Sequence, residues 1–263
     1  LRGLSLAAAE VDARGLRLDR HWMLVDPEGR FVTQRQQPRM ALIDCAPEAE
    51  GLRLAAPNMA PLRLDAPAAG AETLEVQLWG QRCQALAWGA EADAWLSHFL
   101  QRPVRLVAMP EGSVRRLDPE YAQPQDQTGF ADGFPFLLIS EASLADLNQR
   151  VGRVLPMQRF RPNLVISGCE PYAEDGWRRI RIGELEFRVA KPCSRCVIPT
   201  IDFVTGEHGR EEDMVAEQPG ALVIHVRDEN PVGAGHFARL EVDHRVVVHE
   251  EQPELVVLGF RVV

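Results

Sequence analysis

Lysine is nearly absent from this sequence. Lys191 is the only lysine among 29 lysine and arginine residues, so arginine carries almost all of the positive charge. The guanidinium group is a planar fork that can hold a phosphate or carboxylate in bidentate fashion, which suits a local anion site. The formal net charge is −9, whereas broad nucleic-acid binding needs a cationic face. We therefore predict no nucleic-acid partner.

Long apolar runs are missing too. No stretch approaches the ~20 consecutive apolar residues that a membrane-spanning helix requires, so we predict no membrane span. The start of the chain lacks the charged segment and following apolar run that mark a signal peptide. The first residue is leucine rather than methionine, and we expect the native protein to begin earlier.

Cysteine is sparse and odd in number for a chain of 263 residues. Secreted disulfide scaffolds use dense, even sets of cysteines, whereas a sparse odd set is typical of a reducing compartment. We therefore predict a cytoplasmic protein without a disulfide scaffold. The five cysteines lie at positions 45, 83, 169, 193 and 196.

The first hundred residues are typical of short strands and turns. The clearest unit is a hairpin, in which His21–Val25 and Phe31–Gln34 are the strands and Asp26–Gly29, with the sequence Asp-Pro-Glu-Gly, is the turn. Residues 90–102 carry apolar side chains at helical spacing. Short strands at close spacing, together with one helix, favour a barrel or a sandwich.

A polar stretch, Pro110–Gln127, separates the two halves of the chain. We place the domain boundary in it, with one domain at residues 1–112 and the second at residues 113–263. The whole is predicted to be a β-rich α+β fold, in which an N-terminal β-barrel domain precedes a second β-barrel domain with a few helices.

The second half begins with a strand predicted at Phe136–Ile139. A helix should follow it, with Ser140 or Ser143 as the N-cap and Gly152 at its end. Three later stretches also have the composition of strands, namely "RFRPNLVISG", "WRRIRIGELEFRVA" and "HFARLEVDHRVVVHEE".

The stretch "KPCSRC" places Cys193 and Cys196 with two residues between them. A structural zinc site usually needs two such pairs, and a thioredoxin-like dithiol should open a helix, whereas the following residues, which include Pro199, predict extended backbone. Two other interpretations are a pair of buried apolar cysteines and a single thiolate on a soft metal. The neighbouring cations Arg195 and Lys191 favour a thiolate. The pattern itself leaves these interpretations open.

Three motifs resemble the MOSC domain, which takes its name from the C-terminal domain of molybdenum cofactor sulfurase. They are "VAKPCSRCVIPTIDFVTGE", "RFRPNLVISG" and "FADGFPFLLISEASLADLN". The front of the chain, with "GLRLDRHWMLVDPEGRFVTQRQQPR", is similar to the β-barrel domain that precedes MOSC in one group of the family. That group contains bacterial YcbX-type proteins and the mitochondrial amidoxime-reducing component. The resemblance runs from the first residue to about Gly206.

This resemblance implies a molybdenum cofactor (Mo-molybdopterin), in which one pterin dithiolene and one protein cysteine hold the metal. The family's ligand is the second cysteine of its Cys-Ser-Arg-Cys motif, which is Cys196 here, and it is the implied catalytic and metal-binding residue. Ser194 and Arg195 fall on positions that line the cofactor. Cys193 is expected to be structural.

Four further residues match cofactor-lining positions of the family. Arg161 and Asn163 match a pair on the pterin phosphate side, Asp132 a lining position, and Arg20 an arginine of the barrel domain. Arginines suit an anionic, phosphate-bearing cofactor because they bind it bidentately. From the residues alone, Arg20 could instead pair with Asp19, and Asp132 could belong to an ordinary turn.

By the same resemblance, the chain would reduce N-hydroxylated compounds (hydroxylamines, amidoximes and N-hydroxylated bases) to amines. The sequence ends without the Cys-rich ferredoxin extension of some relatives, so we expect a separate electron donor that is ferredoxin-like, flavoprotein-like or cytochrome b5-like. Pyridoxal phosphate binding is a term attached to the family as a whole. The alternative functions are a sulfur or molybdenum cofactor carrier that uses Cys196 as persulfide or transfer site, and a non-catalytic module.

Overall fold

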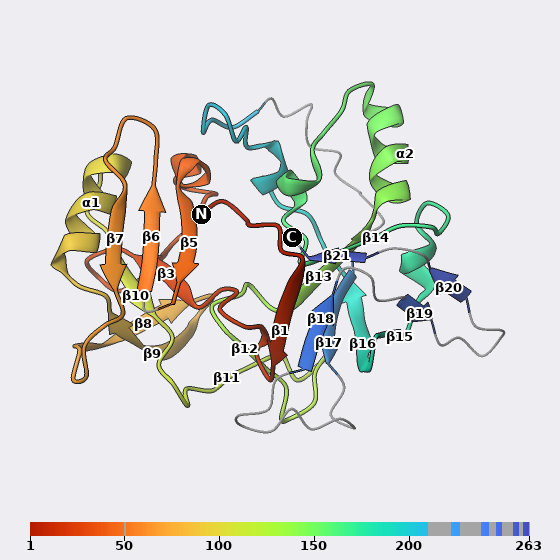
Figure 1. Cartoon of the computed structure of the whole chain (residues 1–263), viewed down its shortest axis with the longest axis horizontal. Coiled ribbons are helices and arrows are strands. Elements are labelled where there is room, and N and C mark those ends of the chain that lie inside the picture. The colour runs from red at the N-terminus through yellow and green to blue at the C-terminus, as the bar shows by residue number, and fades with distance from the viewer. Residues whose placement is uncertain are drawn as a thin grey trace. The chain divides into compact units, whose positions relative to one another are not determined.

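The computed structural model describes residues 1–49 and 51–209 and five later strands at 222–226, 238–241, 246–248, 255–257 and 260–262. Contacts divide the chain, drawn in Figure 1, into two compact units. Unit 1 comprises Leu1–Leu4, Leu18–Arg115 and Thr200–Arg210, and unit 2 comprises Ser5–Arg17, Arg116–Pro199 and Glu211–Val263.

The chain passes between the two units more than once. One change of unit falls between Arg115 and Arg116, close to the boundary predicted between residues 112 and 113. Strand β1 (Ala8–Asp12), near the N-terminus, nevertheless belongs to unit 2. Segments from both halves of the chain therefore occur in each unit. The predicted assignment of the domains to residues 1–112 and 113–263 stays a prediction.

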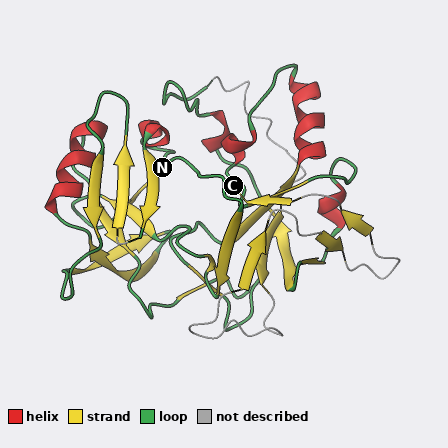
Figure 2. Cartoon of the chain, viewed as in Figure 1, coloured by secondary structure: helices red, strands yellow, loops and turns green. Residues whose placement is uncertain are grey.

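Unit 1 is built on two antiparallel sheets and one α-helix (Figure 2). The larger sheet has the order β4-β3-β10-β9-β8, and the smaller has the order β5-β6-β7. Its elements are β3 (Trp22–Val25), β4 (Phe31–Val32), η1 (Pro38–Leu42), β5 (Asp44–Glu48), β6 (Gly51–Ala55), β7 (Leu62–Asp65), β8 (Thr73–Leu78), β9 (Gln81–Ala87), α1 (Ala90–Leu100) and β10 (Arg105–Ala108).

The predicted hairpin is confirmed at β3 and β4. The Gly29 N–H donates to the Asp26 carbonyl at 2.9 Å and closes the turn. Gly29 has φ +78, and a Cβ there would lie 2.8 Å from the Glu75 carbonyl oxygen, so both the backbone angle and the space require glycine. The sequence Asp-Pro-Glu-Gly thus fixes this corner of unit 1 locally.

The core of unit 1 forms where the strands and α1 turn apolar side chains inward. In β6 every second residue is buried, with Leu52 and Leu54 fully inaccessible, as the two-residue period of a strand requires. Helix α1 buries Leu96 and Phe99 on the same cluster. Burying each large apolar side chain stabilises the fold by about 1.5–3 kcal/mol.

Unit 2 contains an eight-stranded curled sheet with the order β20-β19-β15-β16-β17-β13-β14-β21, and a three-stranded sheet with the order β18-β1-β2. Its elements are β1, β2 (Gly15–Leu16), β12 (Gln127–Thr128), β13 (Phe136–Ser140), α2 (Glu141–Val151), η2 (Met157–Phe160), β14 (Leu164–Ile166), η3 (Ala173–Gly176), β15 (Arg179–Ile182), β16 (Leu185–Pro192), β17 (Leu222–Val226), β18 (Ala238–Glu241), β19 (Val246–Val248), β20 (Leu255–Val257) and β21 (Phe260–Val262).

Two short elements lie where the chain changes unit. Strand β11 (Arg115–Arg116) pairs with β12 in a two-stranded sheet, and η4 (Ile198–Thr200) follows the cysteine stretch. The polar stretch Pro110–Gln127 therefore includes β11 and the start of β12.

Helix α2 confirms the predicted capping. The Ser140 side chain accepts a hydrogen bond from the Ser143 N–H, and Gly152 ends the helix with φ +73. Strands β13 and β14 on either side of α2 run parallel, as a crossover connection allows. Phe136 of β13 meets Phe187 of β16 edge to face, with ring centroids 5.4 Å apart, in the fully buried core.

The predicted β-rich α+β class is confirmed, and the part that the structure describes has two α-helices among many strands. One strand prediction is wrong in part. Of "RFRPNLVISG", only Leu164–Ile166 is a strand, because the chain before it turns through η2. Much of "HFARLEVDHRVVVHEE" lies outside the described residues, but Ala238–Glu241 and Val246–Val248 are strands. No helix in the described ranges is both long and apolar enough to cross a bilayer.

Candidate functional site

The cysteine stretch begins where strand β16 ends. β16 pairs with β17 as far as Pro192, with an irregularity in register between Val189 and Lys191. Proline has no N–H to donate, so it suits the end of a ladder. The residues from Cys193 to Cys196 then run as irregular chain. Their side chains are therefore not bound to the alternation of a strand.

The chain after Cys196 differs from the sequence-based expectation. Instead of continuing in extended form, residues Ile198–Thr200 make one 3₁₀ turn, η4. Pro199 suits such a turn because its φ is fixed near the helical value. The turn is too short to be the helix that a thioredoxin-like dithiol would open.

The two cysteines have different surroundings. Cys193 packs against the apolar cluster that contains Phe160 and Val165, and its thiol donates to the Ser194 carbonyl at 3.5 Å. Burial raises the pKa of the Cys193 thiol, and the opposing effects of Arg195 and Lys191 are smaller. The two cations do favour a thiolate at Cys193, as expected, but burial outweighs them. Its contacts are those of a packing residue.

Cys196 is half-buried and lies next to Arg195. Among the residues that the structure describes, no three His, Cys, Asp or Glu side chains gather closely enough to hold a metal ion together. The thiol of Cys196 therefore belongs to no cluster of three or more such side chains within the described ranges. A metal that binds here needs most of its other ligands from a bound group rather than from this part of the chain.

Arg195 is the most unusual side chain of the stretch. Its Nε is buried and has no hydrogen-bond partner among the described residues, and its guanidinium carbon lies 5.5 Å from the centre of the Phe160 ring. Burial lowers the pKa of Arg195, while the thiols of Cys193 and Cys196 act in the opposite direction. A buried donor without a partner costs about 1–3 kcal/mol, so this group is suited to an anionic ligand.

Ser194 and Asp132 are exposed members of the same neighbourhood. The charge of Asp132 raises the pKa of Cys193, which places the carboxylate within electrostatic reach of the cysteine stretch. The structure therefore brings Asp132, Arg195 and Cys196 together around Cys193, although Asp132 is more than sixty residues upstream of the cysteine stretch.

Arg161 and Asn163 lie in the connection between η2 and β14. Arg161 ends η2 in the left-handed region, with φ +54, and directly follows Phe160. Asn163 is 6% exposed. Its side-chain Oδ1 accepts from the Leu137 N–H at 3.0 Å, and its backbone N–H donates to the Leu137 carbonyl at 2.8 Å. Asn163 thus joins β14 to β13, and its predicted contact with a cofactor stays a prediction.

Arg20 belongs to unit 1. It has φ +50, and its Nε lies 3.6 Å from the Asp19 carboxylate. The structure therefore contains the ion pair that the sequence left as an alternative. Both side chains are about one-third exposed, so the pair contributes roughly 0–1 kcal/mol. The proposed contact of Arg20 with a cofactor stays a prediction.

Sequence reasoning missed the role of Lys191. Its ammonium group lies 4.0 Å from the centre of the Tyr121 ring and 5.6 Å from that of Phe134, and the two rings meet edge to face. Nothing in the local sequence signals this contact, because Tyr121 is distant along the chain. The lysine that precedes the cysteine stretch therefore contacts two aromatic rings from other loops.

Arg188 ties the same loop to β16. Its guanidinium donates to the Asp126 carboxylate at 2.7 Å and to the Tyr121 carbonyl at 2.9 Å, and the Asp126 side chain is only 8% exposed. Together with Lys191, it anchors residues 121–134 beside the strand that leads into the cysteine stretch. The later part of the polar stretch is therefore held against β16 by these contacts.

Two family models match the chain. The model of the MOSC N-terminal beta barrel domain matches residues 1–103. The model of the MOSC domain matches residues 125–250.

Similar curated proteins are mitochondrial amidoxime-reducing components. Component 1 of Mus musculus is 39% identical over 81% of this chain and 65% of its own length, and that of Homo sapiens is 36% identical over 81% and 66%. Component 1 of Danio rerio is 34% identical over 81% of this chain and 68% of its own length. The chain thus spans about two-thirds of these relatives. A solution structure from Bordetella bronchiseptica covers 40% of this chain and 90% of its own at 20% identity, with a TM-score of 0.33.

Proposed function

The chain belongs to the MOSC-domain family, in the group of the amidoxime-reducing components, and on this premise we propose that it reduces N-hydroxylated compounds to amines with a molybdenum cofactor. The relatives' names supply the type of reaction. The structural support comes from unit 2 alone.

One observation carries the proposal. Arg195 has a buried Nε for which the described part of the chain offers no hydrogen-bond partner, and it lies beside the half-buried Cys196. An isolated buried cation is costly, whereas a cation facing an anionic group gains charge-assisted hydrogen bonds. The stretch therefore combines a soft sulfur donor, Cys196, with a cationic group that can bind an anion, Arg195. These are the two things that a metal held by an anionic, phosphate-bearing pterin requires from a protein.

The residues present fit that cofactor. Cys196 would be the protein's thiolate on the metal, because soft ligands suit soft metals, and Cys193 would support the stretch from the apolar cluster. When bound, the cofactor supplies two-electron oxygen-atom transfer, by which an N-hydroxylated compound becomes an amine and water. In balance, the N–O bond breaks, the substrate takes up two electrons and two protons, and the oxygen leaves as water.

The remaining proposed roles concern binding and orientation. Arg195 and Ser194 would donate hydrogen bonds to the cofactor beside the metal, and Arg161 and Asn163 would bind its phosphate side. Asp132 would line the same cofactor, and Arg20 would reach it from unit 1. Hydrogen bonds around a metal ligand orient it and tune the metal, so each of these residues would affect potential as well as affinity.

The electrons would come from a separate redox protein that is ferredoxin-like, flavoprotein-like or cytochrome b5-like. The substrate would be a small N-hydroxylated molecule. A cytoplasmic location and the family-level term pyridoxal phosphate binding stay predictions. A sulfur or cofactor carrier is the alternative, and it differs in one respect: a persulfide on Cys196 would need no anion site at Arg195.

Metal analysis of matched variants tests the proposal. Protein expressed with molybdenum cofactor supply should retain molybdenum, and Cys196→Ala should lose most of it. The matched control is Cys193→Ala, which removes the packing thiol and should keep the metal. Arg195→Gln should weaken retention by about tenfold to a hundredfold, as is usual for residues that support metal ligands.

Activity completes the test. The loaded protein should form amine from an N-hydroxylated purine with an artificial electron donor, and Cys196→Ala should not. Zinc or no metal in the wild-type protein would overturn the enzyme proposal. Retention of molybdenum with no amine formed would instead favour a cofactor carrier.

A further inference from the structure

Unit 1 contains a pocket that none of the proposed cofactor residues lines. Its volume is about 640 Å³, within the range of about 300–1,000 Å³ typical of small-molecule sites. The residues that matter for its chemistry are Arg30, Phe31, Gln36, Gln77, Trp79 and Arg102. All of them fall within Leu18–Arg115, so the pocket belongs to unit 1 alone.

The apolar part of the pocket is centred on Trp79. This residue forms the tip of the β8–β9 hairpin with Gly80, and both have positive φ, +51 and +81. Such a turn normally carries Asn-Gly or Asp-Gly, and a bulky residue there is disfavoured. Trp79 is nevertheless 47% exposed, although Phe31 lies in a tilted contact at 4.8 Å and the Arg35 guanidinium carbon lies 4.9 Å from the centre of its ring. The hairpin thus holds an indole ring at the surface at a cost to the backbone.

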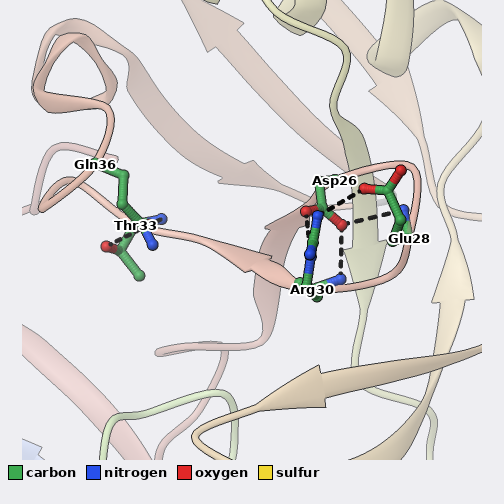
Figure 3. Close-up of polar contacts among 5 residues, drawn as sticks. All are labelled: Asp26, Glu28, Arg30, Thr33 and Gln36. Carbon is green, nitrogen blue, oxygen red and sulfur yellow. Dashed lines mark hydrogen bonds and ion pairs between the residues drawn. The ribbon is translucent and has the colours of Figure 1, made fainter.

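The cation available to a ligand is Arg102. Among the described residues, its guanidinium has no hydrogen-bond or ion-pair partner, whereas the guanidinium of Arg30 is bound by Asp26 at 2.8 Å and by Glu28 at 2.9 Å. Figure 3 shows these contacts within the β3–β4 turn. The charge of Arg30 is therefore compensated locally. Arg102 is left to attract an anion.

Amide groups add uncommitted donors to the wall. The Oε1 of Gln36 accepts from the backbone N–H and the hydroxyl of Thr33, as Figure 3 shows, so its Nε2 is the group left for other partners. In the described part of the chain, the Gln77 side chain makes no hydrogen bond, and only its backbone N–H donates, to the Gly29 carbonyl. Donors without acceptors in a pocket favour a ligand rich in acceptor atoms.

We propose that this pocket binds a planar aromatic molecule that carries a phosphate or a carboxylate. The flat ring packs against the indole of Trp79 beside Phe31, where apolar area and ring stacking favour an aromatic partner. The anionic group pairs with Arg102, and the glutamine amides donate to it or to the ring's acceptors. Because Asp26 and Glu28 already pair with Arg30, Arg102 supplies the uncompensated positive charge of the lining in a chain of net charge −9.

Calorimetric titration tests the site with three probes: adenosine 5′-monophosphate, phenyl phosphate and indole-3-acetate. The first two carry phosphate and the third carboxylate, so their ranking identifies the anion. Adenosine lacks the phosphate and should bind at least about tenfold more weakly than the nucleotide, because one charged hydrogen bond is worth about that factor. Ribose 5-phosphate keeps the phosphate but lacks the ring, and it should also bind about tenfold more weakly because it loses the packing against Trp79.

Variants locate the binding. Arg102→Gln and Trp79→Asn should each weaken binding by about tenfold to a hundredfold, and asparagine is chosen because it tolerates positive φ. The matched control is Arg82→Gln on the same hairpin, whose guanidinium is 75% exposed, pairs with Glu75 and does not line the pocket. It should leave binding unchanged. Thermal melts confirm that each variant is folded.

Three outcomes would overturn the proposal: no saturable binding of any probe, equal binding by Arg102→Gln, or an equal loss in Arg82→Gln, which would show a mere effect of net charge. Cys196→Ala should bind the probes like the wild type. A failure here therefore leaves the proposed reductase function untouched, and the reverse also holds.

Discussion

The buried carboxyl group of Glu174 is predicted to hold the N-terminal end of helix α2 in unit 2. Glu174 is fully buried, and its Oε1 accepts from the Ser140 N–H at 2.9 Å and from the Ser143 hydroxyl at 2.7 Å. Its Oε2 has no hydrogen-bond partner in the ranges that the structure describes. Ser140 is the N-cap of α2, so the acid completes the capping network from a distant segment, η3.

The cost of Glu174→Ala follows from these contacts. The Ser140 N–H would be left buried without an acceptor, at about 1–3 kcal/mol, and a cavity would add to that cost. Two effects offset part of the loss. The Ser143 hydroxyl can turn to the Ser140 hydroxyl, 2.7 Å away, and an acid with one unpaired buried oxygen disappears. We expect a net loss of about 2–4 kcal/mol in the unfolding free energy of unit 2.

Glu174→Gln separates the hydrogen bonds from the charge. The amide oxygen can accept both bonds, so the loss should be only about 1 kcal/mol. Glu170→Ala is the control in the same segment, because Glu170 is exposed, and it should change stability by less than about 0.5 kcal/mol.

Unfolding of unit 2 can be followed through Trp177. Of the five tryptophans, only Trp177 lies in unit 2. Its side chain is 1% exposed, and its backbone N–H donates to the Glu174 carbonyl. In fluorotryptophan-labelled protein, the ¹⁹F resonance of Trp177 during urea titration reports this unit by itself. If Glu174→Ala costs no more than Glu174→Gln or the Glu170 control, the capping role is refuted.

Two further predictions concern single charges. Lys191→Gln should loosen the loop around Tyr121 and Phe134 by about 0.5–2 kcal/mol, seen as faster amide exchange there, whereas Lys191→Arg should largely retain the contact; equal exchange in all three proteins would contradict it. Burial raises the pKa of Asp26, but hydrogen bonds from Arg30 outweigh it and hold the pKa below the ordinary 3.8. The stabilisation by Asp26 is then complete above about pH 4 and is lost as the pH falls through the lowered pKa, so Asp26→Asn should flatten the acid limb of the stability curve of unit 1.

Local sequence signals predicted the elements that depend on neighbours along the chain. The Asp-Pro-Glu-Gly turn could be predicted because its backbone angle at Gly29 favours glycine. The ends of α2 could be predicted because the Ser140 hydroxyl caps its first turn and Gly152 adopts the left-handed conformation that ends it. The stretch before β14 failed the same reasoning. Its composition suits a strand, but Arg161 adopts a left-handed conformation that ends η2 instead.

For the candidate site too, the sequence indicated some features and only the structure showed others. The sequence pointed to the cysteine stretch and to its unequal cysteines, through the motif's resemblance to a family. It could not show that Arg195 keeps a buried donor without a partner among the described residues, because burial depends on Phe160 and the cluster around it. Nor could it show that burial outweighs the nearby cations at Cys193.

By itself, the sequence predicted the β-rich fold class and the capped helix, since both rest on residue types at short spacing. The family and the candidate thiol came from the resemblance of its motifs to the MOSC domain. Only the tertiary structure decided which distant groups meet. Lys191 contacts Tyr121 and Phe134, Glu174 caps α2, and Trp79 stands over a pocket with Arg102 because sheets and loops bring remote segments together. Burial and electrostatics depend on which residues are close in space, and a local sequence pattern does not show which distant residues meet.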